Sequence, residues 1–401
     1  MNRILIIGAG GVGQTAARKC AQYGDDFSAI CLASRTKSKC DLVRSDLSSH
    51  LTTADVDADD VASVVNLIDS FGADLVLNAA LPPQNLPIMD ACLQTGTHYV
   101  DTSAPEPDPS KYEIFCYKWQ TDYHDRFVDR GIMALLSFGF DPGVTNLYCA
   151  YAAKHLYDEI HSVDILDCNG GSHGHPFATN FNPVTNILEV TQKGIYWQDG
   201  KWCEIEPFSI HRSFDFQQIG PREMYVIYHE EMETLVTRLP HLREMRFWMH
   251  FSEEYLTHLE VLQNVGLTSM EAVEFEGRQI RPLEFLRQVL PDPASLGSRY
   301  SGRTNIGCLF HGVKDGEAKN YYIYNVCEHA KCYEEVKSQA ISYTTAVPAV
   351  TGARLILNGT LMKPGVYLPE DLDPDPLMDA LPDAGLPWHI EDSPQMECHP
   401  V

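Results

Sequence analysis

The first residues that could do chemistry are three glycines near the start of the chain, Gly8, Gly10 and Gly13. They follow the uncharged β-type segment 4–7 and lead into a helical pattern over 14–22. A glycine turn of this spacing lets the backbone N–H groups of a helix N-terminus approach a pyrophosphate closely. Together with Gly11 and Val12, these glycines are predicted to bind a dinucleotide cofactor.

The end of the next expected strand, 27–33, should reach the ribose of such a cofactor. Its tip carries hydroxyls and cations in Ser34, Arg35, Thr36 and Lys37, and no carboxylate occurs before Asp41. NAD sites place an acid at this point to bind the 2′-hydroxyl, whereas an arginine suits a 2′-phosphate. The tip therefore favours NADP(H) over NAD(H).

Further expected strand ends carry residues that should border the cofactor, because ligands of open parallel sheets bind there. These residues are Asp57, Asn78, Ala79, Gly139 and Phe140. Asp57 could hydrogen-bond the adenine amino group. Its neighbours Asp59 and Asp60 are natural caps for a helix over 61–71.

Two acids occupy strand ends where the nicotinamide should lie. Asp101 ends the expected strand 98–101, and Asp141 follows the expected strand 132–137. Both are predicted to contact the substrate and to act in catalysis. Asp141 could equally cap a helix that begins at Pro142, since proline is common in a first helical turn.

The elements that position these residues alternate regularly between strands and helices. Strands are expected at 27–33, 74–80, 98–101 and 132–137, and helices at 61–71, from 85 to 96 and at 111–130. This alternation predicts an α/β fold with a Rossmann-type doubly wound parallel sheet over residues 1–146.

The rhythm changes after Asn146. Residues 147–337 are predicted to form an α+β domain for substrate binding and dimerisation, with a mainly antiparallel sheet and a hairpin at Lys314-Asp315-Gly316. A helix over 338–358 is expected to return to the first domain, so that about 338–401 completes it. The tail from Pro364 is expected to be a surface strap.

Polar loops of the second domain supply candidates for substrate binding, namely Asn169, Thr179 and Asn180. His173 and His175 titrate near neutral pH, and His173 is a candidate catalytic residue. Arg246 or Arg303 could clamp a carboxylate.

Composition excludes several classes of function. The formal net charge of −25 disfavours nucleic acid as a partner. The twelve cysteines form no C-x-x-C pair, and no histidine or cysteine group has zinc spacing, so we expect no metal. The N-terminal apolar run is too short for a signal peptide or a membrane span, which favours a cytoplasmic protein with reduced thiols and no membrane partner.

Several longer stretches carry a resemblance to a known family. They include IIGAGGVG, LASRTKSKC, FGFDPGVTN, DCNGGSHGHPFATNFNP, YHEEMETL and YYIYNVCEH, and they extend over the whole chain. On these stretches the chain resembles the saccharopine dehydrogenase-like reductases.

The resemblance implies a homodimer that uses NADPH for the reductive condensation of L-aspartate 4-semialdehyde with 1,3-diaminopropane or putrescine. The products would be carboxynorspermidine or carboxyspermidine, in polyamine biosynthesis. Two alternatives stay open: a saccharopine dehydrogenase of lysine metabolism, and a non-catalytic NADP(H)-binding redox sensor.

Overall fold

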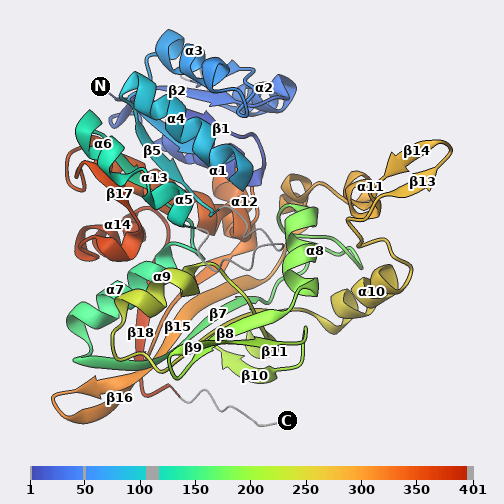
Figure 1. Ribbon diagram of the computed structural model, residues 1–401, viewed down its shortest axis with the longest axis vertical. Helices are drawn as coiled ribbons and strands as arrows, with labels where there is room; N and C mark the ends of the chain where they lie inside the picture. The colour runs from blue at the N-terminus through green and yellow to red at the C-terminus, as the bar shows by residue number, and fades with distance from the viewer. Residues whose placement is uncertain (1, 48–50, 105–116, 395–401) are drawn as a thin grey trace. The chain divides into compact units, whose positions relative to one another are not determined.

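The structure, a computed structural model, describes residues 2–47, 51–104 and 117–394 (Figure 1). The chain divides into two compact units. Unit 1 comprises Met1–Asp158, Glu233–Pro240 and Ser342–Trp388, and unit 2 comprises Glu159–Met232, His241–Ile341 and His389–Val401. Among the described residues, no helix is long and apolar enough to cross a membrane.

Unit 1 contains a seven-stranded sheet in the order β17-β6-β5-β4-β1-β2-β3, in which every pair of neighbours is parallel. The strands are β1 (Asn2–Ile7), β2 (Phe27–Ala33), β3 (Leu51–Ala54), β4 (Leu75–Asn78), β5 (His98–Asp101), β6 (Met133–Leu135) and β17 (Gly365–Tyr367). The order of the first six is that of a dinucleotide-binding fold. The predicted doubly wound parallel sheet is confirmed.

Strand β1 shows why this sheet is covered on both faces. Leu5 and Ile7 pack in one cluster with Val64 of helix α3 (Val61–Phe71) and Ile88 of helix α4 (Asn85–Thr95). Ile4, whose side chain alternates to the other face, is also fully buried. An apolar run without alternation is typical of a parallel strand between two layers of helices.

The helices of unit 1 begin and end where local signals place them. They are α1 (Gly11–Gln22), α2 (Lys37–Asp46), α3 (Val61–Phe71), α4 (Asn85–Thr95), α5 (Lys118–Thr121), α6 (His124–Arg130), α7 (Val144–His155) and α14 (Asp375–Asp383). Asp60 caps α3 by accepting from the Ala62 N–H, as predicted. Gly96 ends α4 in the left-handed conformation.

Two expectations for unit 1 are wrong. The expected long helix over 111–130 is two short helices, α5 and α6, in its described part, and residues 105–116 lie outside the described residues. The tail from Pro364 is no surface strap, because its β17 pairs with β6 as the edge strand of the sheet and Val366 and Leu368 are buried. The density of Pro and Asp in the tail concealed this short strand.

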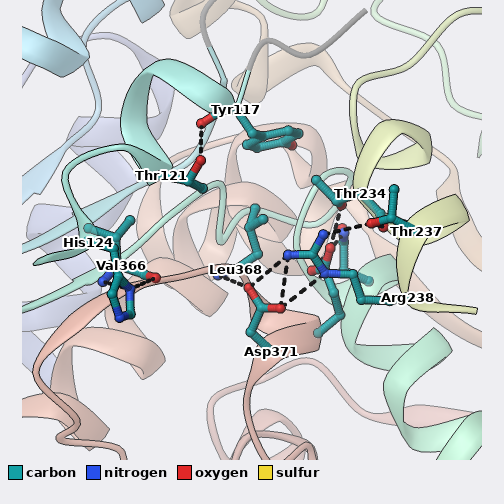
Figure 2. Close-up of polar contacts among 11 residues, drawn as sticks. Tyr117, Thr121, His124, Thr234, Thr237, Arg238, Val366, Leu368 and Asp371 are labelled. Atoms are coloured by element: carbon teal, nitrogen blue, oxygen red, sulfur yellow. Dashed lines mark hydrogen bonds and ion pairs between the residues drawn. The ribbon is translucent and has the colours of Figure 1, made fainter.

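Side chains fasten the returning tail to unit 1 (Figure 2). The His124 ring bonds to the main chain of Val366, and Asp371 accepts from the Leu368 N–H. The Arg238 guanidinium forms an ion pair with Asp371 at 3.1 Å. Arg238 ends helix α9 (Glu231–Arg238), whose residues from Glu233 onward belong to unit 1.

Unit 2 is built on a nine-stranded sheet. Its strands are β7 (Glu159–Asn169), β8 (Gly194–Gln198), β9 (Lys201–Ile205), β10 (His211–Phe216), β11 (Gly220–Ile227), β12 (Glu244–His250), β15 (Arg303–Lys314), β16 (Glu317–Glu328) and β18 (Trp388–Asp392), of which Trp388 belongs to unit 1. Strands β12 and β7 pair in parallel, whereas the pairs β10–β11, β11–β12, β12–β8, β8–β9, β7–β15 and β15–β16 are antiparallel. The predicted mainly antiparallel sheet is confirmed.

The predicted hairpin joins β15 to β16 through Asp315 and Gly316, both with positive φ as a two-residue type I′ turn requires. The remaining elements are α8 (Pro183–Thr191), α10 (Glu253–Asn264), β13 (Val273–Phe275), β14 (Arg278–Ile280), α11 (Pro282–Val289), α12 (His329–Val336) and α13 (Ala340–Leu357). From Ser342 onward α13 belongs to unit 1, and it contains Pro348.

A buried carboxyl group links three segments of unit 1. Glu370 accepts hydrogen bonds from the Thr234 hydroxyl and, at 3.0 Å, from the Asn146 side-chain amide. Asn146 in turn accepts from the Gly143 N–H at the start of α7. Burial raises the pKa of Glu370 from 4.5 to about 7.

This shift predicts a pH dependence of stability. The unfolded chain loses the Glu370 proton near 4.5, and the folded chain keeps it up to about pH 7. The folded state therefore binds more protons in that window, and its free energy of unfolding falls as pH rises. In the wild type this decrease amounts to up to about 3 kcal/mol, and we expect it to be absent in Glu370→Gln. Melting temperatures recorded from pH 5 to 8 test this difference.

The exposed substitution Asp383→Asn in α14 is the matched control, and we expect it to follow the wild-type pH profile. Identical slopes for Glu370→Gln and the wild type would contradict the assigned shift.

Candidate active site

The glycine turn of unit 1 is packed so tightly that only glycine fits at two of its positions. Gly8 has a φ of +110°, and a Cβ there would lie 2.3 Å from the Ala79 carbonyl oxygen. A Cβ on Gly13 would lie 1.8 Å from the Gly8 carbonyl oxygen. These contacts bring the start of α1 directly onto the ends of β1 and β4.

Gly10 differs, because a Cβ built on it meets no atom of the described residues within 4 Å. It is the N-cap of α1, and no side chain caps that helix. The N-terminus of α1 therefore offers backbone donors and the positive end of its dipole beside open space. This arrangement fits the pyrophosphate of a dinucleotide, with Gly11 and Val12 in the first turn of the helix.

At the predicted ribose end, the tip of β2 keeps one cation largely exposed. The Arg35 side chain is 69% exposed, and its nearest carboxylate, Asp59, is 3.9 Å away. Lys37 instead pairs with Asp41 at 3.1 Å. The Ser34 hydroxyl accepts from the Thr36 N–H. Arg35 is thus the group at this tip best placed to bind a 2′-phosphate.

Asp57 is exposed, and its carboxylate accepts from the Asp59 N–H in a turn ahead of α3. This bond leaves the second carboxylate oxygen for the predicted contact with adenine, which stays a prediction.

Asp101 is 1% exposed and accepts three hydrogen bonds through its carboxylate. The donors are the Tyr99 hydroxyl at 2.8 Å, the Gln120 amide at 2.7 Å and the Ser137 N–H. Burial raises its pKa to about 6. The carboxylate thereby holds the main chain at Ser137, and its predicted contact with the substrate stays a prediction.

Asn78 belongs to the same buried network. Its amide donates to the Tyr99 hydroxyl at 3.0 Å and to Asn85 at 2.8 Å, and its oxygen accepts from the Ala80 N–H. The Asn78 side chain is therefore engaged inside unit 1, and the predicted cofactor contacts of Asn78 and Ala79 stay predictions.

Gly139 and Phe140 form a tight loop after β6. The Gly139 carbonyl accepts from the Val144 N–H, and a Cβ on Gly143 would lie 2.2 Å from that carbonyl oxygen. Phe140 is buried against Tyr148. The loop is thus tightly packed at the strand ends. The predicted contacts of Gly139 and Phe140 with the cofactor stay predictions.

The alternative role of Asp141 as a helix cap is wrong. Helix α7 begins at Val144 with Gly143 as its N-cap, and Asp141 precedes Pro142 through a cis peptide bond. Asp141 is half-buried. Its predicted contact with the substrate stays a prediction.

In unit 2 the structure brings together two of the predicted substrate residues. The Asn169 amide donates to the Tyr300 hydroxyl at 2.8 Å, and that hydroxyl donates to the Asn180 side-chain oxygen at 2.7 Å. Burial raises the pKa of Tyr300 to about 12, so the hydroxyl keeps its proton.

His329 packs against this group and is hydrogen-bonded to it. Its ring stacks on Tyr300 with centroids 3.7 Å apart, and its Nε2 lies 3.0 Å from the Asn169 side-chain oxygen. A Cβ on Gly171 would lie 2.7 Å from the His329 ring, and one on Gly302 would lie 2.7 Å from Gly171. Glycines at both positions are what let these segments meet.

Of the other candidates in this unit, His173 lies beside the group and Thr179 is buried. The His173 ring meets Tyr300 edge-on at 5.3 Å. Burial, together with His175, lowers the pKa of His173, so its neutral form dominates at neutral pH. Thr179 is 1% exposed and its hydroxyl donates to the Phe181 carbonyl, and its predicted contact with the substrate stays a prediction.

The two arginines considered as clamps already have partners. Arg246 pairs with Glu244 at 2.9 Å, and Arg303 pairs with Glu328 at 3.2 Å. No pattern in the sequence predicted a role for Tyr300 or His329. His329 lies in the family stretch YYIYNVCEH, which was the available signal, whereas nothing in the spacing around Tyr300 marks it.

A second histidine cluster lies at the start of α9. His229, Glu230 and Glu231 place one possible ligand atom each within 4.8 Å of one another. His229 Nδ1 bonds to the Glu231 carboxylate, and the ring stacks on Phe247 at 4.0 Å. These contacts within unit 2 explain the cluster, and we assign it no metal.

Family models match both parts of the chain. The saccharopine dehydrogenase NADP binding domain matches residues 4–135, and the saccharopine dehydrogenase C-terminal domain matches residues 139–386. The chain belongs to the saccharopine dehydrogenase family. The fold agrees, since apo saccharopine dehydrogenase (L-Glu forming) from Saccharomyces cerevisiae superposes with a TM-score of 0.74 at 15% identity, covering 98% of this chain and all of the other.

Two curated relatives are similar over nearly their whole length. Carboxyaminopropylagmatine dehydrogenase from Synechocystis sp. is 54% identical, and carboxynorspermidine synthase from Vibrio alginolyticus is 41% identical, each over 97% of both chains. With the matched NADP binding domain, this confirms an NADP-dependent oxidoreductase that uses NADP(H).

The glycine geometry yields a direct test of the pyrophosphate site. We expect Gly10→Ala to fold normally, because its Cβ meets only open space. The same methyl group would occupy the space that a pyrophosphate needs, so the Kd for NADPH should rise about tenfold or more. Titration of NADPH fluorescence measures Kd, and thermal unfolding checks the fold.

Gly24→Ala is the control, since Gly24 is exposed and its Cβ likewise meets nothing. An unchanged Kd in Gly10→Ala would place the pyrophosphate elsewhere.

Proposed function

We propose that the chain catalyses the NADPH-dependent reductive condensation of L-aspartate 4-semialdehyde with a primary amine of polyamine biosynthesis. With 1,3-diaminopropane or putrescine the product is carboxynorspermidine or carboxyspermidine. The observation that carries the proposal is the identity of 41–54% to relatives named for such products, over both units of the chain.

The choice of amine has a second candidate. The relative with 54% identity is named for carboxyaminopropylagmatine, which is agmatine bearing a carboxyaminopropyl group. The relatives named for carboxynorspermidine are 41% identical. This difference favours agmatine as a further amine substrate, and the formal charge of −25 suits any of these cations.

The chemistry requires that the amine attack the aldehyde as a free base, that water leave, and that the resulting imine be reduced. NADPH supplies the hydride when bound at the α1 N-terminus. Neutral His173 can take the proton from the incoming ammonium. The amide groups of Asn169 and Asn180 offer donors for the amino-acid carboxylate, and Asp141 offers a carboxylate for an ammonium.

The two alternatives from the sequence have less support. The yeast saccharopine dehydrogenase shares the fold at 15% identity, which says nothing of substrate. A redox sensor without turnover does not account for the polar Asn169–Tyr300–Asn180 group in unit 2.

We further propose a homodimer in the cytoplasm, formed through unit 2. Large apolar side chains that are between half and two-thirds exposed gather within one stretch of this unit. They are Val261 and Val265 of α10, Val273 and Phe275 of β13, and Phe285 and Val289 of α11. Exposed apolar side chains concentrated in one region are typical of an interaction surface.

The reaction is tested by NADPH oxidation with L-aspartate 4-semialdehyde and each amine in turn. We expect oxidation that needs both aldehyde and amine, and a clear preference for NADPH over NADH, because the largely exposed Arg35, held by a 3.9 Å ion pair with Asp59, suits a 2′-phosphate. Diaminopropane, putrescine and agmatine are compared by kcat/KM. Turnover with lysine and 2-oxoglutarate alone would move the chain to the saccharopine branch.

The dimer surface is tested by Phe275→Glu, with the exposed unit 1 change Leu42→Glu as control. A charge on a buried apolar contact carries a desolvation cost, so we expect the mass in solution to move toward the 45.0 kDa monomer for Phe275→Glu alone. Light scattering after gel filtration measures this mass. A dimer that survives the change would exclude β13 from the interface.

A further inference from the structure

We propose that the side-chain amide of Asn180 recognises the carboxylate of the amino-acid substrate, and that His329 and Tyr300 are positioning residues that fix its orientation. This rests on the proposed function, in which that substrate is an α-amino acid bearing an aldehyde. It adds two residues that the sequence did not reveal, and it states for each hydrogen bond which atom donates and which accepts.

A main-chain N–H group decides which nitrogen of His329 donates a hydrogen bond and which accepts one. The Ala340 N–H donates to His329 Nδ1 at 3.1 Å, so the proton of the neutral ring sits on Nε2. Burial, helped by His173, lowers the pKa of His329 to about 3, which keeps the ring neutral. His329 Nε2 therefore donates to the Asn169 oxygen at 3.0 Å.

Each further bond follows from the one before. The Asn169 oxygen also accepts from the Gly171 N–H, so its NH₂ group must be the one that faces Tyr300. The Tyr300 oxygen accepts this bond, and its own proton goes to the Asn180 oxygen at 2.7 Å. With its oxygen held, Asn180 presents its NH₂ group.

That NH₂ group has no hydrogen-bond partner among the residues that the structure describes, although the Asn180 main-chain carbonyl accepts from Gln339. The nitrogen of this group is also accessible to solvent, since it is not one of the fully buried side-chain atoms that lack a hydrogen-bond partner. An oriented, accessible donor selects an acceptor, and it opposes an ammonium group. The carboxylate is the acceptor that an amino acid brings.

Wild-type turnover decides the proposed function, and variants then decide this inference separately. Tyr300→Phe keeps the ring stacked on His329 and removes the hydroxyl that holds Asn180. We expect its KM for L-aspartate 4-semialdehyde to rise about 3- to 10-fold, with KM for the amine within about twofold. Asn180→Asp should raise the same KM by about 10- to 100-fold, because a charged acceptor replaces the donor.

His329 is tested by rescue. A glutamine at this position can accept from Ala340 and donate to Asn169, whereas leucine can do neither. We expect His329→Leu to raise KM for the aldehyde substrate as Tyr300→Phe does, and His329→Gln to stay nearer the wild type. Tyr333→Phe is the control, since the Tyr333 hydroxyl has no hydrogen bond within the described ranges.

A binding measurement separates recognition from a loss of structure. L-2-aminobutyrate and its carboxamide are compared as inhibitors competing with the aldehyde. We expect the wild type to prefer the carboxylate, and Asn180→Asp to lose or invert that preference. The inference is overturned if folded Tyr300→Phe and Asn180→Asp keep the wild-type KM and the wild-type inhibitor preference.

Discussion

The Asp101 carboxylate is the constraint on which the ligand-binding edge of unit 1 depends. A buried charge is costly unless hydrogen bonds replace its water, and here three donors do so. Because these donors come from Tyr99, Gln120 and Ser137, satisfying the one carboxyl group holds strand ends and a helix in a single arrangement. Asn78 joins this network through Tyr99. The glycine turn then closes onto the Ala79 carbonyl beside it.

Unit 2 also orients a buried polar group through hydrogen bonds, but without a charged side chain. Its polar group is neutral throughout, and main-chain N–H groups of Ala340 and Gly171 decide which atoms donate. Rigid neutral donors suit a substrate that carries both signs of charge, because they distinguish a carboxylate from an ammonium by hydrogen-bond direction. Unit 1 contributes the cofactor site and unit 2 the polar group, and the family match extends over both.

The sequence was most informative where a single local rule operates. The parallel sheet of unit 1, the α3 cap at Asp60 and the Asp315-Gly316 hairpin follow from periodicity and turn chemistry. It was least informative where distant segments meet. Asp101 ends a strand as expected, yet its burial depends on Gln120 and Ser137, which no pattern links to it. Tyr300 and His329 were missed because their partner Asn169 is far from them in the chain.

The place of β17 has a consequence for how the protein is made. Gly365–Tyr367 pairs with β6, although all of β7 to β16 lies between these strands in the chain. A nascent chain therefore leaves the ribosome with β6 as an unpaired sheet edge until residues 365–367 have been translated. Such an edge can pair with other chains. During this interval of synthesis, β6 is an exposed strand edge that a chaperone could cover.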